Sequence, residues 1–125
     1  MKRHESAEDY LETILILRDR LGTVRSIDIV NEMNFTKPSV SIGMKNLREK
    51  GCIAMDTDGY ITLTAQGEAI AKCVYERHLV LTKALVAIGV PPEIAKEDAC
   101  RVEHDISPET FDKIKDLLER FVGYD

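Results

Sequence analysis

The sequence contains no tryptophan and has only three cysteines and four prolines among its 125 residues. Cys52, Cys73 and Cys100 are odd in number and scattered, which argues against a disulfide framework, and we interpret Cys52 and Cys73 as small buried residues. No apolar run approaches the roughly 20 residues that span a bilayer, and the first ten residues contain no apolar signal core. We therefore expect a cytoplasmic protein with no membrane partner.

Positive charge is also scarce, with 17 Lys and Arg against 22 Asp and Glu and a net charge of −5. This balance weakens a DNA-binding hypothesis without excluding it, because nucleic-acid binding needs a local positive potential rather than a basic average. The first half of the chain has such a local excess, at Arg25, Lys37, Lys45, Arg48 and Lys50.

The first half of the sequence has the order helix, short helix, helix and hairpin, which is typical of a winged helix-turn-helix. Ser6 and Ser26 are expected to be N-caps, and Pro38 suits the first turn of the third helix. The Asp58-Gly59 pair predicts a tight hairpin turn. The alternative is a small structural α+β domain. The expected elements are helices over 5–21, 27–33 and 38–50, and strands over 53–56 and 60–63.

The second half is predicted to be entirely helical. A long helix capped by Thr64 runs to about Ile88, a second opens at Pro91-Pro92 and runs to about Glu103, and a third begins after Ser107. The last helix carries a regular apolar face that is typical of a dimer surface, formed by Phe111, Ile114, Leu117, Leu118 and Phe121. We therefore expect a mainly α protein. We expect residues 1–70 to form a winged helix-turn-helix DNA-binding domain, with three helices plus a β-hairpin wing. We expect it to be joined to a helical domain over 71–125, for metal binding, as argued below, and for dimerisation.

Cys100, Glu103 and His104 are the most informative residues of the chain. On a helix, positions i, i+3 and i+4 share one face, so a thiol, a carboxylate and an imidazole would project together. These donors suit a borderline divalent metal such as Fe, Mn, Co, Ni or Zn. Taken singly, Cys100 could equally be a small core residue, and the other two a solvated face.

Two further helices offer ligand-type residues. Asp9 and Glu12 form an acidic pair at i, i+3, and His78 lies on the long helix. Each has an ordinary alternative, because acidic pairs usually form a solvated face and a lone histidine is usually core or surface filler. The presence of suitable donors on three helices together favours a metal site.

The sequence resembles the diphtheria toxin repressor and manganese transport regulator family of metal-dependent repressors over nearly its whole length. The most specific of the matching motifs is the one that contains Cys100, Glu103 and His104. The motifs that carry the resemblance are Glu8-Asp9-Tyr10-Leu11-Glu12, Pro38-Ser39-Val40-Ser41, Leu63-Thr64-Ala65-Gln66-Gly67, Arg77-His78-Leu79 and Ala99-Cys100-Arg101-Val102-Glu103-His104-Asp105-Ile106-Ser107.

The resemblance implies a homodimer that binds palindromic double-stranded operator DNA when Fe²⁺ or Mn²⁺ is bound, and that represses metal-homeostasis genes. It implies a two-domain form without the SH3-like third domain of many iron-branch members, and no small-molecule substrate. By position, Asp9, Glu12, His78, Glu103 and His104 match the ligands of the manganese branch, whereas Cys100 matches the iron branch.

Some residues differ from those of each branch, and these differences affect which metal ion is expected. Asp9 stands where the iron branch has Met, and Lys96 and Thr82 replace two of its ancillary ligands, so that version of the second site is in doubt. Carboxylates and imidazole suit Mn²⁺, whereas a thiolate favours Fe²⁺, and in vitro Co²⁺, Ni²⁺ or Zn²⁺ by the usual affinity order. On this chemistry Fe²⁺ is expected slightly ahead of Mn²⁺. A cation that ties the first helix to the second lobe would fix the separation of two recognition helices.

The resemblance also indicates which residues of this chain would face DNA. Thr36, Pro38, Ser39 and Ser41 lie where the family touches bases and backbone, and Ile42 stands where the iron branch has a polar base reader. The remaining positions are expected to contact phosphates: Arg25, Ser26, Lys37, Lys45 and Arg48.

Three other functions stay open from the residues alone. One is a winged helix-turn-helix regulator that does not sense metal. A second is a structural dimerisation module without DNA binding. The third is a metal-dependent hydrolase, which the sequence disfavours because it has no His-Glu-x-x-His motif and no nucleophile elbow. We therefore expect a protein that is not an enzyme.

Overall fold

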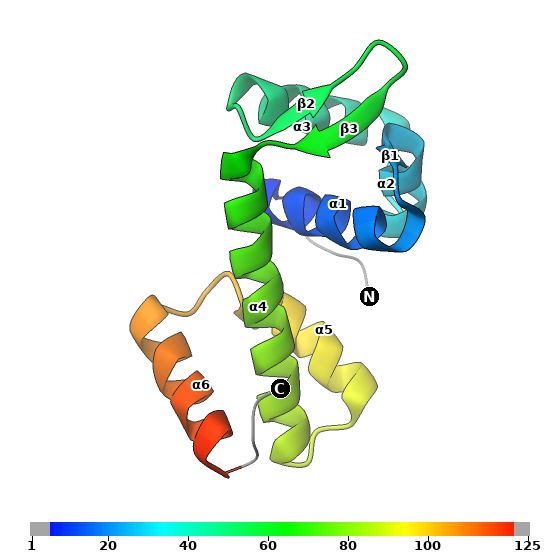
Figure 1. Cartoon of the computed structure of the whole chain (residues 1–125). Coiled ribbons are helices and arrows are strands. Elements are labelled where there is room, and N and C mark those ends of the chain that lie inside the picture. The colour runs from blue at the N-terminus through cyan, green and yellow to red at the C-terminus, as the bar shows by residue number, and fades with distance from the viewer. Residues whose placement is uncertain (1–5, 122–125) are drawn as a thin grey trace. The chain divides into compact units, whose positions relative to one another are not determined.

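The structure is a computed structural model that describes residues 6–121 (Figure 1). The chain divides into two compact units, Lys2–Cys73 and Val74–Asp125, which we describe separately. No helix within the described residues is both long enough and apolar enough to cross a membrane.

The first unit is a winged helix-turn-helix, as the sequence predicted. Its three helices surround a core that includes Leu11, Ile29, Val40 and Met44. The strands form a three-stranded antiparallel sheet in the order β1-β3-β2, with Ile53 paired to Leu63. In chain order the elements are α1 (Ala7–Leu21), β1 (Val24–Arg25), α2 (Ser26–Met33), α3 (Lys37–Glu49), β2 (Ile53–Met55), β3 (Tyr60–Leu63) and the start of α4 (Ala65–Ala87).

One local prediction in this unit was wrong, and one short element was not predicted. Ser26 is the first helical residue of α2 rather than its cap, because the backbone N–H of Arg25 donates to Asp28 Oδ2 at 2.9 Å and so begins the helix one residue earlier. Strand β1 was not predicted, since two residues are too few to show an alternating pattern. The other cap is confirmed: Ser6 Oγ accepts from Asp9 N at 3.1 Å.

A dense set of contacts joins the wing to the start of α4. Thr64 Oγ1 accepts from Gly67 N at 3.1 Å and donates to the carbonyl oxygen of Gly51 at 2.7 Å. Thr64 N donates to the carbonyl oxygen of Cys52 at 3.0 Å. Gly67 lies against that same Cys52 oxygen, so that the position has no room for a Cβ atom. We call these four residues the wing junction.

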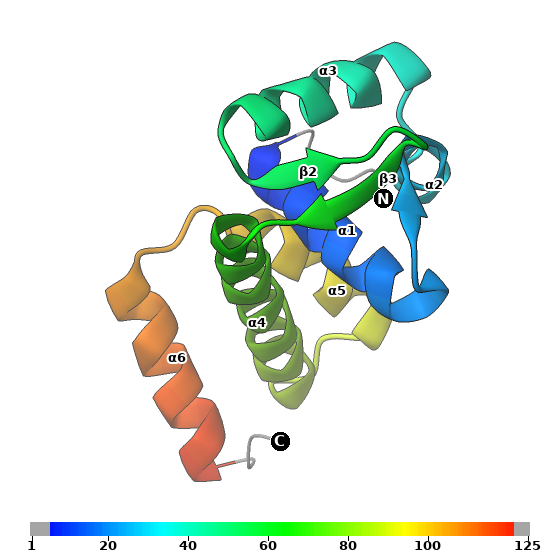
Figure 2. The same cartoon turned by 45° about the horizontal axis from the view of Figure 1, so that its top comes forward.

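The second unit contains the rest of α4, α5 (Pro92–Val102) and α6 (Pro108–Phe121). Helices α5 and α6 lie on opposite sides of α4 in both views (Figure 1 and Figure 2). Phe111 and Leu118 of α6 pack with Val80 of α4 in one buried cluster. The apolar face of α6 therefore serves mainly the core of its own unit. Leu117 is 56% exposed, and the side chain of Phe121 lies outside the described residues.

Candidate metal centre and nucleic-acid interface

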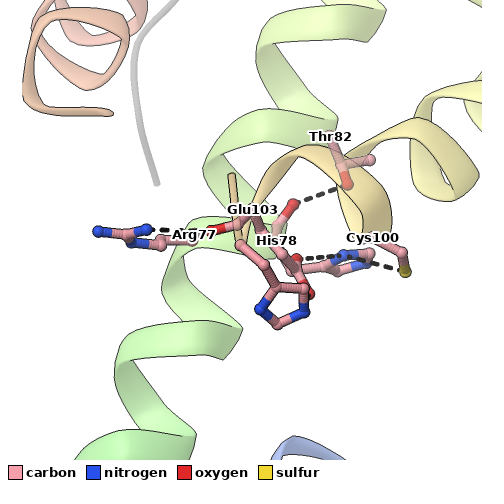
Figure 3. Close-up of polar contacts among 6 residues, drawn as sticks. Arg77, His78, Thr82, Cys100 and Glu103 are labelled. Carbon is pink, nitrogen blue, oxygen red and sulfur yellow. Dashed lines mark hydrogen bonds and ion pairs between the residues drawn. The ribbon is translucent and has the colours of Figure 1, made fainter. Parts of the chain in front are cut away.

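Three of the predicted metal ligands converge in the second unit. His78 projects from α4, Cys100 from α5, and Glu103 is the C-cap residue that directly follows α5. His78 Nδ1 lies 3.2 Å from Glu103 Oε2 and 3.7 Å from Cys100 Sγ (Figure 3). One ligand atom from each residue falls within 4.8 Å of the other two, which is the spacing that donors to one ion require. Glu103 is only 1% exposed, which excludes the alternative that its carboxylate belongs to a solvated face.

The charge state of His78 follows from its neighbours. Hydrogen bonding to Cys100, and then to Glu103, raises the pKa of His78 to about 10, against the opposing effect of its burial. Thr82 holds the backbone of His78 in place, because its hydroxyl donates to the His78 carbonyl oxygen at 2.7 Å. In the metal-free protein at neutral pH this imidazole therefore carries a proton, which a metal ion would have to displace.

The raised pKa predicts a pH dependence for the metal-free protein. Below pH 6.5 His78 is protonated in both the folded and the unfolded chain, so its stabilising contribution is fully present. That contribution should be lost as the pH rises from 6.5 through about 10, because only the folded state then holds the proton. Thermal unfolding in chelator at a series of pH values measures this decline. The His78→Asn variant should lack the part of this decline in stability that comes from the imidazole. An identical decline in that variant would contradict the assignment of the raised pKa to His78.

His104 reaches the Glu103 carboxylate through a turn and not along the face of α5. Helix α5 ends at Val102, and a turn follows in which Asp105 N donates to the Val102 carbonyl oxygen at 2.9 Å. His104 is thus beyond the helix, and the i, i+4 relation to Cys100 does not apply to it. Its Nε2 nevertheless lies 3.4 Å from Glu103 Oε1, so the turn brings this imidazole to the same carboxylate.

Asp9 and Glu12 lie on α1, in the first unit. Their i, i+3 spacing places them on one side of that helix, as predicted. They are 2% and 0% exposed, which removes the solvated-face reading for this pair. Their role as metal ligands remains a prediction from the sequence.

The predicted DNA-contacting residues occupy α3 and the start of α2. Thr36 is the N-cap of α3 and accepts from Ser39 N at 3.2 Å. Ile42 is 62% exposed on α3. Arg25 stacks 4.2 Å from the centre of the Tyr60 ring. The other predicted residues on these two helices are Ser26, Lys37, Pro38, Ser39, Ser41, Lys45 and Arg48, all exposed or partly exposed.

Two further side chains lie where the sequence did not predict them. Cys73 is exposed, not buried, because α4 turns Ala71 and Val74 inward and leaves Cys73 on its outer side. Tyr10 packs its ring so close to α3 that a Cβ atom on Gly43 would lie 2.6 Å from it. The signal for this contact was a glycine within an apolar helical stripe, which often marks a close approach.

Two known domain families together match almost the whole chain. Residues 3–61 match the iron dependent repressor N-terminal DNA binding domain, and residues 64–122 match the iron dependent repressor metal binding and dimerisation domain. The transcriptional regulator MntR of Escherichia coli O157:H7 is 36% identical over 113 residues, which cover 90% of this chain and 73% of the relative. HTH-type transcriptional regulator MntR of Lysinibacillus sphaericus is 32% identical and is covered to 82%, with 91% of this chain matched.

Solved structures show the same fold. The manganese regulator SloR superposes with a TM-score of 0.82 at 24% identity over 95% of this chain, and T. acidophilum IdeR with a TM-score of 0.78 at 27% identity over 95%. This chain spans about half the length of those two proteins, 55% in each case. The domain matches and the sequence identity lead to one conclusion: the chain belongs to the iron-dependent repressor family, whose members are metal-dependent, DNA-binding transcriptional regulators rather than enzymes.

Proposed function

We propose that this protein represses metal-homeostasis genes by binding operator DNA as a homodimer when Fe²⁺ or Mn²⁺ occupies a site built on His78, Cys100 and Glu103. The observation that carries the proposal is the convergence of an imidazole, a thiol and a buried carboxylate from α4 and α5. Their chemistry fits a divalent transition metal, which when bound supplies positive charge that offsets the thiolate and the carboxylate.

The proposed ligand set also includes His104, Asp9 and Glu12. His104 is supported by its 3.4 Å approach to Glu103. Asp9 and Glu12 are supported by their burial, by their spacing on α1 and by the family resemblance. Within this set the protein must release protons to bind metal, from the Cys100 thiol and from His78. Metal affinity should therefore fall as the pH is lowered.

The metal is proposed to be Fe²⁺ or Mn²⁺. One solved neighbour is a manganese-dependent transcriptional repressor in complex with manganese. The Cys100 thiol adds a softer donor, which favours Fe²⁺ over Mn²⁺ and would also accept Co²⁺, Ni²⁺ or Zn²⁺ in vitro.

The test is a fluorescence anisotropy titration against a labelled duplex selected from random DNA in the presence of Mn²⁺. We expect operator affinity to rise at least about tenfold with Fe²⁺ or Mn²⁺ relative to chelator, which requires a coupling of about 1.4 kcal/mol. Equal affinity in chelator and metal, unchanged by Cys100→Ala, would instead identify a regulator that does not sense metal.

On DNA, α3 is proposed to enter the major groove. The exposed Ile42 side chain offers an apolar contact for a thymine methyl group, and the hydroxyls of Ser39 and Ser41 offer contacts to bases or phosphates. The basic residues Arg25, Lys37, Lys45 and Arg48 are proposed to position the helix on phosphates.

Lys45→Ala is predicted to lower the salt dependence of operator binding. One lost phosphate contact should reduce the slope of log affinity against log salt by about one unit. Anisotropy titrations at four salt concentrations measure the slope. Lys72→Ala on α4, which removes an exposed lysine paired with Glu68, is the control and should leave the slope unchanged. An unaltered slope for Lys45→Ala would remove this residue from the interface.

The dimer surface is proposed to lie around the turn between α4 and α5. Val86, Ile88 and Ile94 are 41%, 78% and 49% exposed within nine residues of chain, in the domain whose family model describes dimerisation. A second copy of the chain is the proposed occupant. Half-sites of the operator would then be spaced about 34–36 Å apart, or a multiple of that distance.

Ile88→Glu is predicted to weaken the dimer by about tenfold or more, because burying an isoleucine side chain contributes roughly 1.5–3 kcal/mol. Analytical ultracentrifugation across a concentration series measures the dimer dissociation constant. Leu21→Glu places the same charge on a 51% exposed leucine of the first unit and should leave the constant unchanged. If both variants remain equally dimeric, the interface lies elsewhere.

A further inference from the structure

Arg77 on α4 contacts groups that lie outside the proposed set of metal ligands. Its Nη1 donates to the carbonyl oxygen of Glu103 at 3.0 Å and to that of Ile106 at 3.4 Å. These two carbonyls lie at the beginning and end of the turn that follows α5. A helix end leaves carbonyl groups without partners inside the helix, and an arginine can satisfy them. Arg77 thus clamps the turn at both ends.

The same guanidinium also contacts α6. It lies 5.4 Å from the centre of the Phe111 ring, which is itself buried with Val80 and Leu118. Stacking on a buried ring restricts the rotation of a planar cation and so fixes the direction of its N–H donors. A lysine at this position could keep the charge but has no planar donor group.

Arg77 and His78 are neighbours on α4 and act on the same residue. Arg77 contacts the backbone of Glu103, whereas His78 contacts its carboxylate at 3.2 Å. Figure 3 shows the two side chains leaving α4 in opposite directions, with the imidazole directed towards Cys100. His104 belongs to the same turn and reaches the same carboxylate. The position of both Glu103 and His104 therefore depends on the conformation of the segment that Arg77 clamps.

We propose that Arg77 is a positioning residue for the metal centre, which sets the direction of Glu103 and His104 without binding the ion itself. This inference rests on the proposed function. Residues that hold a metal ligand in place without binding the ion typically change metal affinity by about 10–100-fold when they are removed. Arg77→Met should therefore weaken metal binding at least about tenfold, and Arg77→Lys should recover only part of the loss.

The experiment is a Co²⁺ titration of the full chain followed by absorption spectroscopy, because the visible bands of Co²⁺ report coordination geometry and the near-ultraviolet band reports the thiolate. Wild-type protein should show both bands. Arg77→Met should show a lower affinity and altered visible bands with the thiolate band retained, since Cys100 lies outside the clamped turn. The matched control is Lys115→Met, which breaks another link between α4 and α6, the 3.2 Å pair with Glu76.

The outcomes separate this inference from the proposed function. If wild-type protein binds no Co²⁺, both fail. If wild-type protein binds Co²⁺ and Arg77→Met gives the same affinity and spectrum, the positioning role alone fails. Thermal unfolding of the metal-free variants measures the general cost of each substitution. Equal effects of Arg77→Met and Lys115→Met on Co²⁺ affinity, with unchanged visible bands in both, would likewise reduce Arg77 to an ordinary structural contact.

Discussion

Glu103→Gln is expected to abolish the metal response. The substitution keeps the size of the side chain and removes its negative charge, at a position that is 1% exposed and lies close to both His78 and His104. A neutral amide lacks the negative charge with which a carboxylate attracts a divalent cation. Metal affinity should therefore fall by at least about a hundredfold, which is roughly 2.8 kcal/mol at 1.4 kcal/mol per factor of ten. Operator binding in Mn²⁺ should then match operator binding in chelator.

Isothermal titration with Mn²⁺, together with operator anisotropy at a fixed metal concentration, measures this effect. Glu93→Gln in the first turn of α5 is the matched control, because it removes the same charge from an exposed position at the opposite end of α5 from Glu103. The pKa of His78 should also fall in Glu103→Gln, since Glu103 is one of the two groups that raise it. A variant that keeps wild-type Mn²⁺ affinity would exclude Glu103 from the site.

Gly67→Ala is expected to destabilise the first unit. The added Cβ would collide with the backbone carbonyl oxygen of Cys52, which cannot retreat freely because Thr64 N holds it at 3.0 Å. Overpacking of this kind typically costs about 1–3 kcal/mol, and a rigid backbone neighbour favours the upper end. Operator binding should weaken as well, because the clash displaces the wing junction.

The sign of this effect is diagnostic. Helix propensity alone predicts that alanine in place of glycine within α4 stabilises the protein by roughly 1 kcal/mol. Chemical denaturation followed by circular dichroism measures the free energy of unfolding. Gln66→Ala, at the neighbouring exposed position, serves as the control and should change it by less than about 0.5 kcal/mol. A more stable Gly67→Ala protein would mean that the close contact with Cys52 does not exist.

Local sequence signals predicted most of the fold because each one acts within a few residues. Ser6 and Thr64 each accept a hydrogen bond from a backbone N–H three residues later, a relation that is visible in the sequence itself. The failures were also local. Asp28 starts α2 one residue early through the backbone of Arg25, and this competing cap looked no different from an ordinary surface acid. The exposed position of Cys73 depended on the exact rotation of α4, which composition alone does not determine.

The candidate metal centre was partly visible in the sequence for the same reason. Cys100 and Glu103 are three residues apart, so helical geometry joins them. The approach of His78 to this pair depends on the packing of α5 against α4, and here the family resemblance supplied what spacing could not. Arg77 escaped notice because its partners are backbone carbonyls, and a sequence does not show which carbonyls a helix end leaves open.

The three thiols differ in their exposure to solvent, and this affects how the purified protein should be handled. Cys52 is shielded, Cys100 is half-shielded beside His78, and Cys73 faces outward on α4. The exposed Cys73 thiol can form a disulfide between two copies in air, and that covalent dimer would appear on a non-reducing gel without any non-covalent interface. In a Cys73→Ser background this disulfide cannot form, and the alkylation rate of Cys100 would then report occupancy of the proposed metal site.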